Sequence, residues 1–136
     1  THEAQRKKLS KKAPPTPEES AKKILQHVKD GMDIARAYHL PQSIKDFITT
    51  HHGTSKTGYF YITYKNAHPG EEIDESMFTY EGPQPKTREQ AILMMADSVE
   101  AASHSLKEYT ESNIHALVDS SLSALCPSLF FAIKIK

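Results

Sequence analysis

The sequence predicts a single all-α domain, because it carries several helix-start signals and apolar residues at helical spacing. Thr16 and Thr87 each precede a segment in which a later side chain, Glu19 or Gln90, can complete a capping box, and Thr110 is a third N-cap candidate. The chain has 136 residues, of which 38% are apolar and 25% charged. This length and composition suit one domain with a modest core.

The first helix is expected over residues 17–38. Pro17 suits the first helical position, and Gly31 is a point of expected strain. One face of this helix carries an apolar stripe, formed by Ile24, Leu25, Val28, Met32 and Ala35. A second, short helix is expected over residues 41–50, after which Gly53 lets the chain turn.

The second half of the chain predicts two more helices. One follows Thr87 and reaches about Ser105, and the other covers residues 111–124. The apolar face of the later helix is formed by Ile114, Leu117, Val118 and Leu122. Residues 125–136 form an atypical apolar tail, which is expected to be either a short strand or a segment docked on a partner.

Between these helices, residues 54–86 are ambiguous. Residues 59–64 have the aromatic composition of a strand. His68, Pro69 and Gly70 break whatever element forms there, and residues 81–85 make a rigid loop.

The first fifteen residues differ from the rest of the chain. A basic run over residues 5–12 is followed by Pro14 and Pro15, and this pattern is typical of a flexible arm or of an expression remnant. An arm that binds polyphosphate or anionic lipid is the alternative.

The charge balance and the single cysteine exclude several classes. Seventeen basic and seventeen acidic residues leave no net charge, so the overall field does not favour a nucleic acid polymer or an anionic membrane surface. Cys126 alone excludes an internal disulfide and a thiolate-rich metal site, and it favours a reducing compartment. No apolar run approaches the roughly 18 residues of a membrane span. We therefore expect a soluble domain, even if its parent is a membrane protein.

The candidate site is a metal centre built from histidines and one carboxylate. His51 and His52 are adjacent at a helix end, His27 lies beside the apolar stripe of the first helix, and Asp97 has apolar neighbours on its own helical face. Imidazole is the commonest protein metal ligand, and a carboxylate is costly to bury without a cation or hydrogen bonds. The alternatives are a surface position for His27, a polar helix end for the histidine pair, and an ordinary salt bridge for Asp97.

An ordered set of motifs resembles a known family over about residues 17–117. The motifs are His27-Val28-Lys29-Asp30-Gly31, Leu40-Pro41, His51-His52-Gly53-Thr54, Tyr59-Phe60-Tyr61, Phe78-Thr79-Tyr80-Glu81-Gly82-Pro83 and Ala96-Asp97-Ser98-Val99-Glu100-Ala101-Ala102. They look like the second half of the cytoplasmic HD domain of the seven-transmembrane HD phosphodiesterases, bacterial membrane proteins that hydrolyse cyclic di-AMP.

The resemblance implies an HD-domain-like helical bundle, incomplete at its N-terminal side, with residues 16–124 as its core and a helix over the ambiguous aromatic segment. It implies a pair of divalent metal ions, iron or manganese, with ligands His27, His51, His52 and Asp97. Thr54, Ser55 and Lys56 are weaker candidates for binding a phosphate. The implied partners are a cyclic dinucleotide and the remainder of a membrane-anchored parent protein, on the cytoplasmic side of the bacterial membrane.

One departure from the family bears on activity. The adjacent His-Asp pair that names HD domains does not occur in this sequence, and His2-Glu3 is not a substitute. We therefore expect weak metal retention and little turnover from this chain alone. Two functions are open: a phosphodiesterase, or a nucleotide-binding or regulatory module on the same scaffold without catalysis. Assembly of a homodimer that exchanges helices is a third hypothesis.

The other histidines are expected at the surface, namely His39, His68, His104 and His115. The tyrosines at 59, 61, 64 and 80 are expected to pack in the core or loops rather than to stack on adenine.

Overall fold

The computed structural model describes residues 14–133, with side chains described for residues 14–125. Across this part of the chain the elements are helical, apart from a single isolated bridge between Lys56 and Thr79. In order they are α2 (Pro17–Ala37), α3 (Gln42–Thr50), α4 (Gly58–Ala67), the short 3-10 helix η1 (Glu75–Phe78), α5 (Arg88–Ser103) and α6 (Glu111–Ile133). The all-α prediction is confirmed.

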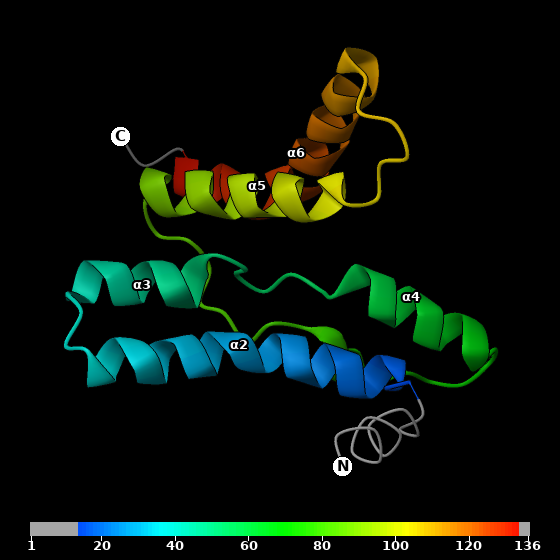
Figure 1. The fold of residues 1–136 in the computed structure, drawn as a ribbon, viewed down its shortest axis with the longest axis horizontal. Helices are drawn as coiled ribbons and strands as arrows, with labels where there is room; N and C mark the ends of the chain where they lie inside the picture. Colours follow the sequence, from blue (N-terminus) through cyan, green and yellow to red (C-terminus); the bar gives the residue numbers. More distant parts are fainter. Residues whose placement is uncertain (1–13, 134–136) are drawn as a thin grey trace, which may run out of the picture.

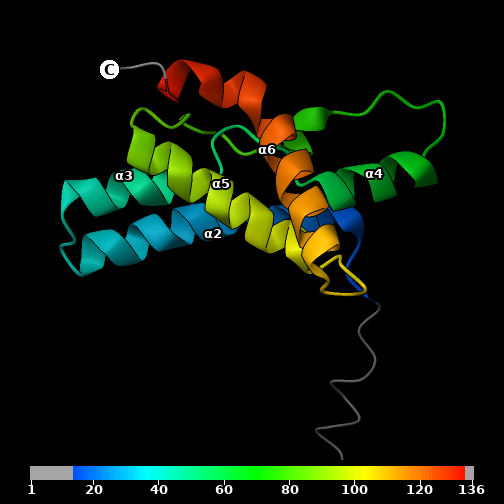
Figure 2. The same cartoon turned by 90° about the horizontal axis from the view of Figure 1, so that it is seen from above.

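The helices form two levels (Figure 1). α2 packs against α3, α4 and η1 in the lower level, and α5 packs against α6 in the upper level. α2 and α3 lie side by side in opposite directions, as both views show (Figure 2). Contacts between α3 and α5 join the levels, so the end of α3 lies where three helices meet.

α2 begins as its sequence predicts. The Thr16 hydroxyl accepts a hydrogen bond from the Glu19 backbone N–H at 3.2 Å, and the Glu19 carboxylate accepts from the Thr16 N–H at 3.0 Å. The helix is continuous through Gly31, where strain was expected. A Cβ atom on Gly31 would lie 3.3 Å from the Ile48 side chain, so this glycine permits the close approach of α3 instead.

α5 begins with only half of the predicted capping box. The Thr87 hydroxyl accepts from the Gln90 N–H at 3.2 Å, as expected. The Gln90 side chain, however, accepts from the Lys86 N–H at 2.8 Å, one residue before the cap. The prediction of a reciprocal box was wrong because a neighbouring backbone donor lay within reach of the same side chain.

The ambiguous aromatic segment is helical, within α4. The last helix was predicted too short, since α6 extends to Ile133 rather than ending near Ala124, and the backbone of residues 125–133 is therefore helical. The predicted arm lies outside the described residues except for its last two positions, as do residues 134–136 of the predicted tail.

The core is small and has two centres. Phe78 of η1 is fully buried and contacts the rings of Tyr61 and Tyr64 on α4, with centroids 5.8 and 5.4 Å away. Ala91 and Met94 of α5 form the second centre, against which partly buried Met95 and Leu125 pack.

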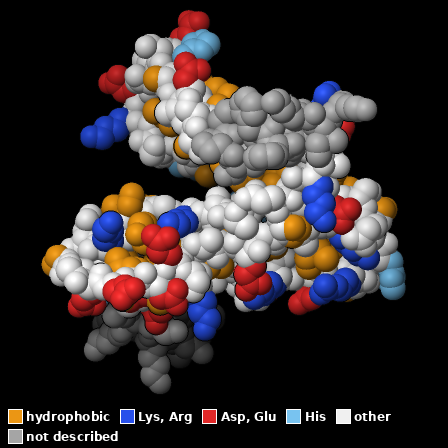
Figure 3. Space-filling view, turned by 180° about the vertical axis from the view of Figure 1, so that it is seen from behind, with side chains coloured by type: hydrophobic (Ala, Val, Ile, Leu, Met, Phe, Trp, Pro, Cys, Tyr) orange, Lys and Arg blue, Asp and Glu red, His pale blue; other side chains and the backbone are white. Residues whose placement is uncertain are grey.

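The surface mixes side chains of both charges with apolar ones, as Figure 3 shows for one face. This agrees with the zero net charge of the chain. Within the described residues, none of the helices combines the length and apolarity required to cross a membrane.

Candidate metal centre

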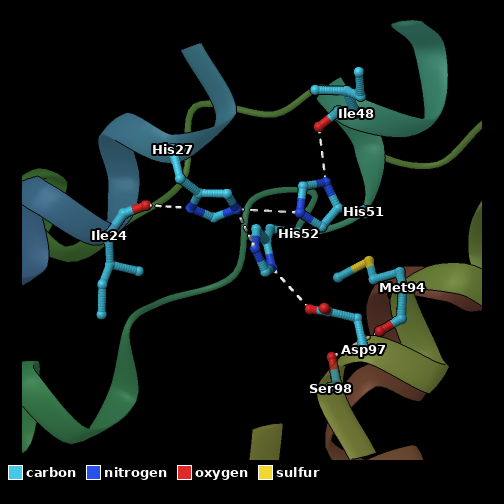
Figure 4. A network of polar contacts seen from close by, with 8 residues as sticks. All are labelled: Ile24, His27, Ile48, His51, His52, Met94, Asp97 and Ser98. Atoms are coloured by element: carbon cyan, nitrogen blue, oxygen red, sulfur yellow. Dashed lines mark hydrogen bonds and ion pairs between the residues drawn. The ribbon is translucent and has the colours of Figure 1, made fainter. Parts of the chain in front are cut away.

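Three imidazoles from two helices converge at the junction of the levels (Figure 4). His27 comes from α2, His51 is the C-cap of α3, and His52 follows it. The His27 Nε2 lies 3.2 Å from the Nε2 of His51 and 3.1 Å from the Nε2 of His52. We call these residues the histidine cluster. One ring nitrogen from each lies within 4.8 Å of the others, so the three can hold one metal ion.

The Nδ1 atoms of two cluster members are bound to backbone oxygens. His51 Nδ1 lies 2.7 Å from the Ile48 carbonyl, and His27 Nδ1 contacts the Ile24 carbonyl. Each carbonyl lies three residues earlier on the same helix. A carbonyl only accepts hydrogen bonds, so each Nδ1 carries the proton and each Nε2 presents a lone pair.

The third member, His52, is held by Asp97 of α5. Its Nδ1 lies 3.2 Å from an Asp97 carboxylate oxygen. Burial, with smaller contributions from His51 and His27, lowers the pKa of His52 to about 4. The ring is therefore neutral at pH 7, and the contact joins an imidazole N–H to a carboxylate rather than two full charges. Burial is also the main reason why the pKa of Asp97 is raised.

Three ring nitrogens this close repel as bare lone pairs, so either a proton on one Nε2, which makes the contacts hydrogen bonds, or a metal ion among them must compensate. Two nitrogens bound to one ion at roughly 2.1 Å are separated by roughly 3.0 Å in octahedral and 3.4 Å in tetrahedral geometry. The two separations that involve His27, 3.1 and 3.2 Å, lie between these values, and all three ligand atoms lie within 4.8 Å of one another. The donor set therefore fits a divalent transition metal, with Asp97 as the outer carboxylate that metal-binding histidines commonly have.

The turn after His52 fixes the pair in place. Gly53 has a φ of +51°, a left-handed conformation that favours glycine. A Cβ atom on Gly53 would lie 2.6 Å from the Gln84 side-chain oxygen and 3.2 Å from the terminal carbon of Met94. Glycine is therefore favoured here by its conformation, and a larger residue would also have to displace the flexible ends of the Gln84 and Met94 side chains.

Tyr80 is a site residue that sequence reasoning missed. Its ring stacks on His52 with centroids 4.1 Å apart and planes at 19°, and it is 9% exposed. Burial, and then the charge of Asp97, raises the pKa of Tyr80 to about 12. The spacing along the chain gives no signal for this contact, since the two residues are brought together only by the fold. Tyr59, which was expected to pack, is 76% exposed.

The three weaker candidates lie in the segment after Gly53. The Thr54 hydroxyl accepts from the Gln84 side chain, and the Ser55 carbonyl accepts from the Tyr80 N–H at 2.9 Å. The Lys56 ammonium lies 2.5 Å from Glu75, which raises the pKa of the lysine. Lys56 is thus paired within this structure.

A cavity of about 1260 Å³ opens beside the histidine cluster. It is lined by α2, by residues of η1, by residues 79–82, and by Thr49, His52 and Gly53. The lining combines apolar side chains of α2 (Leu25, Val28 and Met32) with basic ones (Lys22, Lys29 and Arg36) and acidic ones (Glu18, Glu19, Asp33 and Glu81). Lys29 is paired with Glu81 and Arg36 with Asp33, so an anionic ligand would have to take the place of a carboxylate at either cation.

The HD domain family model matches residues 2–102. The chain is 43% identical over 104 residues to cyclic-di-AMP phosphodiesterase PgpH of Listeria monocytogenes, and 40% identical over 103 residues to PgpH of Bacillus subtilis. Each match covers 76% of this chain and 14% of the relative's length.

Solved structures agree with these matches. The crystal structure of the L. monocytogenes PgpH HD domain in complex with cyclic-di-AMP superposes with a TM-score of 0.73 at 41% identity, covering 81% of this chain and 51% of that one. The structure described as the HD domain alone gives a TM-score of 0.75 at 36% identity, covering 89% of this chain and 58% of that one. The chain thus spans about half of the solved domain.

Proposed function

This chain belongs to the HD domain family, and from that premise we propose that it acts in the metal-dependent hydrolysis of cyclic di-AMP to a linear dinucleotide. The similarity to two phosphodiesterases named for this substrate supports the proposal. The observation that carries it is the convergence of three Nε2 atoms with Asp97 behind one of them.

The histidine cluster would hold one divalent ion, and Asp97 would orient His52 and help to hold a second ion. Iron or manganese suits imidazole and carboxylate ligands together. When bound, a pair of such ions activates water and neutralises charge on the phosphoryl oxygens. The proton on each Nδ1 keeps the Nε2 lone pairs directed at the ion, because each proton already has an oxygen acceptor.

The cavity beside the cluster would receive the dinucleotide. Its apolar side chains on α2 suit bases, and Lys22, Lys29 and Arg36 suit a phosphate once Lys29 and Arg36 leave their partners Glu81 and Asp33. Thr54, Ser55 and Lys56 follow the cluster directly and would donate to a phosphate. Lys56 would first have to exchange its Glu75 partner for the ligand.

The proposed setting is the cytoplasmic side of a bacterial membrane, as the resemblance to the seven-transmembrane HD family supports. The sequence contains no His-Asp dipeptide, and the residues present supply about half of that family's metal ligands. We therefore expect this chain alone to hold metal weakly and to turn over slowly.

A nucleotide-binding or regulatory module is the second candidate, and the missing His-Asp pair favours it. It would keep the cavity and the histidine cluster but lack turnover. The two candidates differ in product formation and not in ligand binding.

The experiment combines elemental analysis, titration with cyclic di-AMP and a hydrolysis assay, each with and without added Mn²⁺. We expect cyclic di-AMP to bind only with Mn²⁺ and linear product to form slowly. His51→Ala should abolish both, whereas the matched exposed variant His104→Ala should abolish neither. Binding without product would support the regulatory module. Binding that ignores Mn²⁺ and His51→Ala would contradict both candidates.

A further inference from the structure

We propose that Tyr80 is a positioning residue of the histidine cluster: its ring fixes the plane of the His52 imidazole so that Nε2 faces His27 and His51. The inference rests on the proposed function in one respect only, which is that the cluster binds a metal ion.

The His52 ring is held by two neighbouring rings and one carboxylate. Tyr80 lies against it nearly face to face, 4.1 Å away at 19°, and His51 lies 4.0 Å away at a tilt of 40°. Asp97 holds the Nδ1 edge. The carboxylate determines which nitrogen faces α5, and Nε2 contacts His27, but these two polar contacts leave the ring free to rock about the line that joins them. The aromatic stack restricts this rocking, because a tilt of the imidazole would meet the tyrosine face.

A short antiparallel pairing joins the segment after the histidines to the segment that carries Tyr80. The Tyr80 N–H donates to the Ser55 carbonyl at 2.9 Å, the Thr57 N–H donates to the Phe78 carbonyl at 2.7 Å, and Lys56 pairs with Thr79 between them. Ser55 follows His52 by three residues, so this pairing sets the register of the two rings.

The Tyr80 ring, and not its hydroxyl, makes the contacts with the cluster. Within the described residues no hydrogen bond joins the Tyr80 hydroxyl to another group, whereas the Tyr61 hydroxyl donates to Glu75 at 2.9 Å. The Tyr80 ring also meets His27 edge to face, with centroids 6.1 Å apart. It therefore contacts two of the three cluster members. The contacts involve the planar face of the tyrosine ring, so phenylalanine should be able to substitute for Tyr80.

The chain offers a matched control in Phe78. It lies two residues earlier, is fully buried, and contacts the tyrosines of α4 rather than the imidazoles. Loss of its ring should weaken the fold without changing the cluster. Tyr80→Leu and Phe78→Leu thus remove comparable aromatic packing from the same segment, and only the first removes the contact with His52.

The experiment measures the Zn²⁺ affinity of each variant by calorimetry, the visible spectrum of bound Co²⁺, and the urea unfolding of the metal-free protein. Tyr80→Phe should bind Zn²⁺ within about twofold of the starting chain. Tyr80→Leu should bind about tenfold more weakly, the lower end of what loss of an outer-shell contact costs, and its Co²⁺ spectrum should change. Phe78→Leu should unfold at lower urea with its Co²⁺ spectrum and Zn²⁺ affinity retained.

Equal Zn²⁺ affinity in folded Tyr80→Leu would overturn the inference, as would an equal loss in folded Phe78→Leu. If Tyr80→Leu fails to fold, Tyr80→Met takes its place, because it keeps the bulk and removes the flat face. Failure of the starting chain to bind Zn²⁺ at all would instead refute the proposed metal site.

Discussion

The seven described histidines divide into two groups by the most distant partner that each contacts along the chain. His27 and His51 contact carbonyls three residues earlier, but their Nε2 atoms meet across 24 residues, and His52 contacts His27 and Asp97 across at least 25 residues. Three of the others contact residues no more than four positions away: His68 contacts Tyr64, His104 contacts Glu100, and His115 approaches Glu111 at 3.9 Å. The fourth, His39, is exposed at the turn after α2 with a φ of +52°. As expected, His104 and His115 are also exposed, but His68 is half-buried because it stacks on Tyr64.

The contacts among the cluster histidines depend on the tertiary fold, whereas those of the other histidines do not. A contact within four residues is available to an isolated helix and stabilises it by only a few tenths of a kcal/mol. The cluster requires α2, the end of α3 and α5 to meet at one point. Such an arrangement of facing lone pairs is retained only if something compensates their repulsion, and the proposed cation does so.

A substitution in the turn after His52 should have the greatest effect on the cluster. Gly53→Ala should destabilise the fold by about 2 kcal/mol, because left-handed strain adds to the displacement of the Gln84 and Met94 side-chain ends. Gly70→Ala is the matched control, with a φ of +82° and open space around its Cβ position, and it should cost only about 1 kcal/mol. Urea unfolding of the two variants checks this. Equal losses would show that the space beside Gln84 and Met94 is not restrictive.

A second pair of variants compares a histidine's carboxylate partner that is distant in the sequence with one that is local. Asp97→Asn should weaken Zn²⁺ binding by about tenfold, equivalent to about 1.4 kcal/mol, because it removes the anionic partner of His52. Glu111→Gln alters the corresponding local partner of His115 on α6 and should leave the affinity unchanged. Calorimetric titration distinguishes the two variants, and the comparison fails if Glu111→Gln has the larger effect.

The smallest expected effect is a pH dependence of the metal-free protein. The folded-state pKa of His52 is about 4, below the ordinary value of 6.5, so the unfolded chain binds this proton more readily. The stability due to neutral His52 is therefore present above pH 6.5 and is lost as the pH falls toward 4. After allowance for solvent screening, we expect a loss of about 1 kcal/mol between pH 7 and pH 5.

The measurement compares urea unfolding of the starting chain and of His52→Asn at both pH values, with a chelator present. The extra loss should be absent in the variant, which has no group to titrate at this position. An NMR titration should place the His52 midpoint well below the ordinary histidine value of 6.5, and a midpoint at that value would show that burial does not lower the pKa of His52.

Local signals in the sequence predicted most of the helices. Thr16 and Glu19 cap α2 as expected, since both halves of a capping box lie within one turn. The end of α6 was missed, because Pro127 is a usual signal for the end of a helix, yet the helix continues to Ile133. Residues 59–64 have the composition of a strand, and the family resemblance rather than propensity indicated the correct helix.

The site was predictable only in part. The residue types of the cluster and Asp97 were recognisable from motifs, and the structure brings them together. Tyr80 was not recognised as part of the site, because its role depends on a pairing between residues 55–57 and 78–80 that the sequence pattern does not predict. The pairing of Lys56 with Glu75 was likewise invisible, since it joins exposed residues from separate elements.

One cation is proposed to join the three Nε2 atoms of the histidine cluster. Anomalous diffraction from crystals soaked in Mn²⁺ would locate it. We expect a peak roughly 2.0–2.3 Å from the Nε2 atoms of His27, His51 and His52, with each Nδ1 still facing its oxygen partner. A peak at His104 or His115 with none in the cluster, or rings turned so that Nδ1 faces the ion, would contradict it.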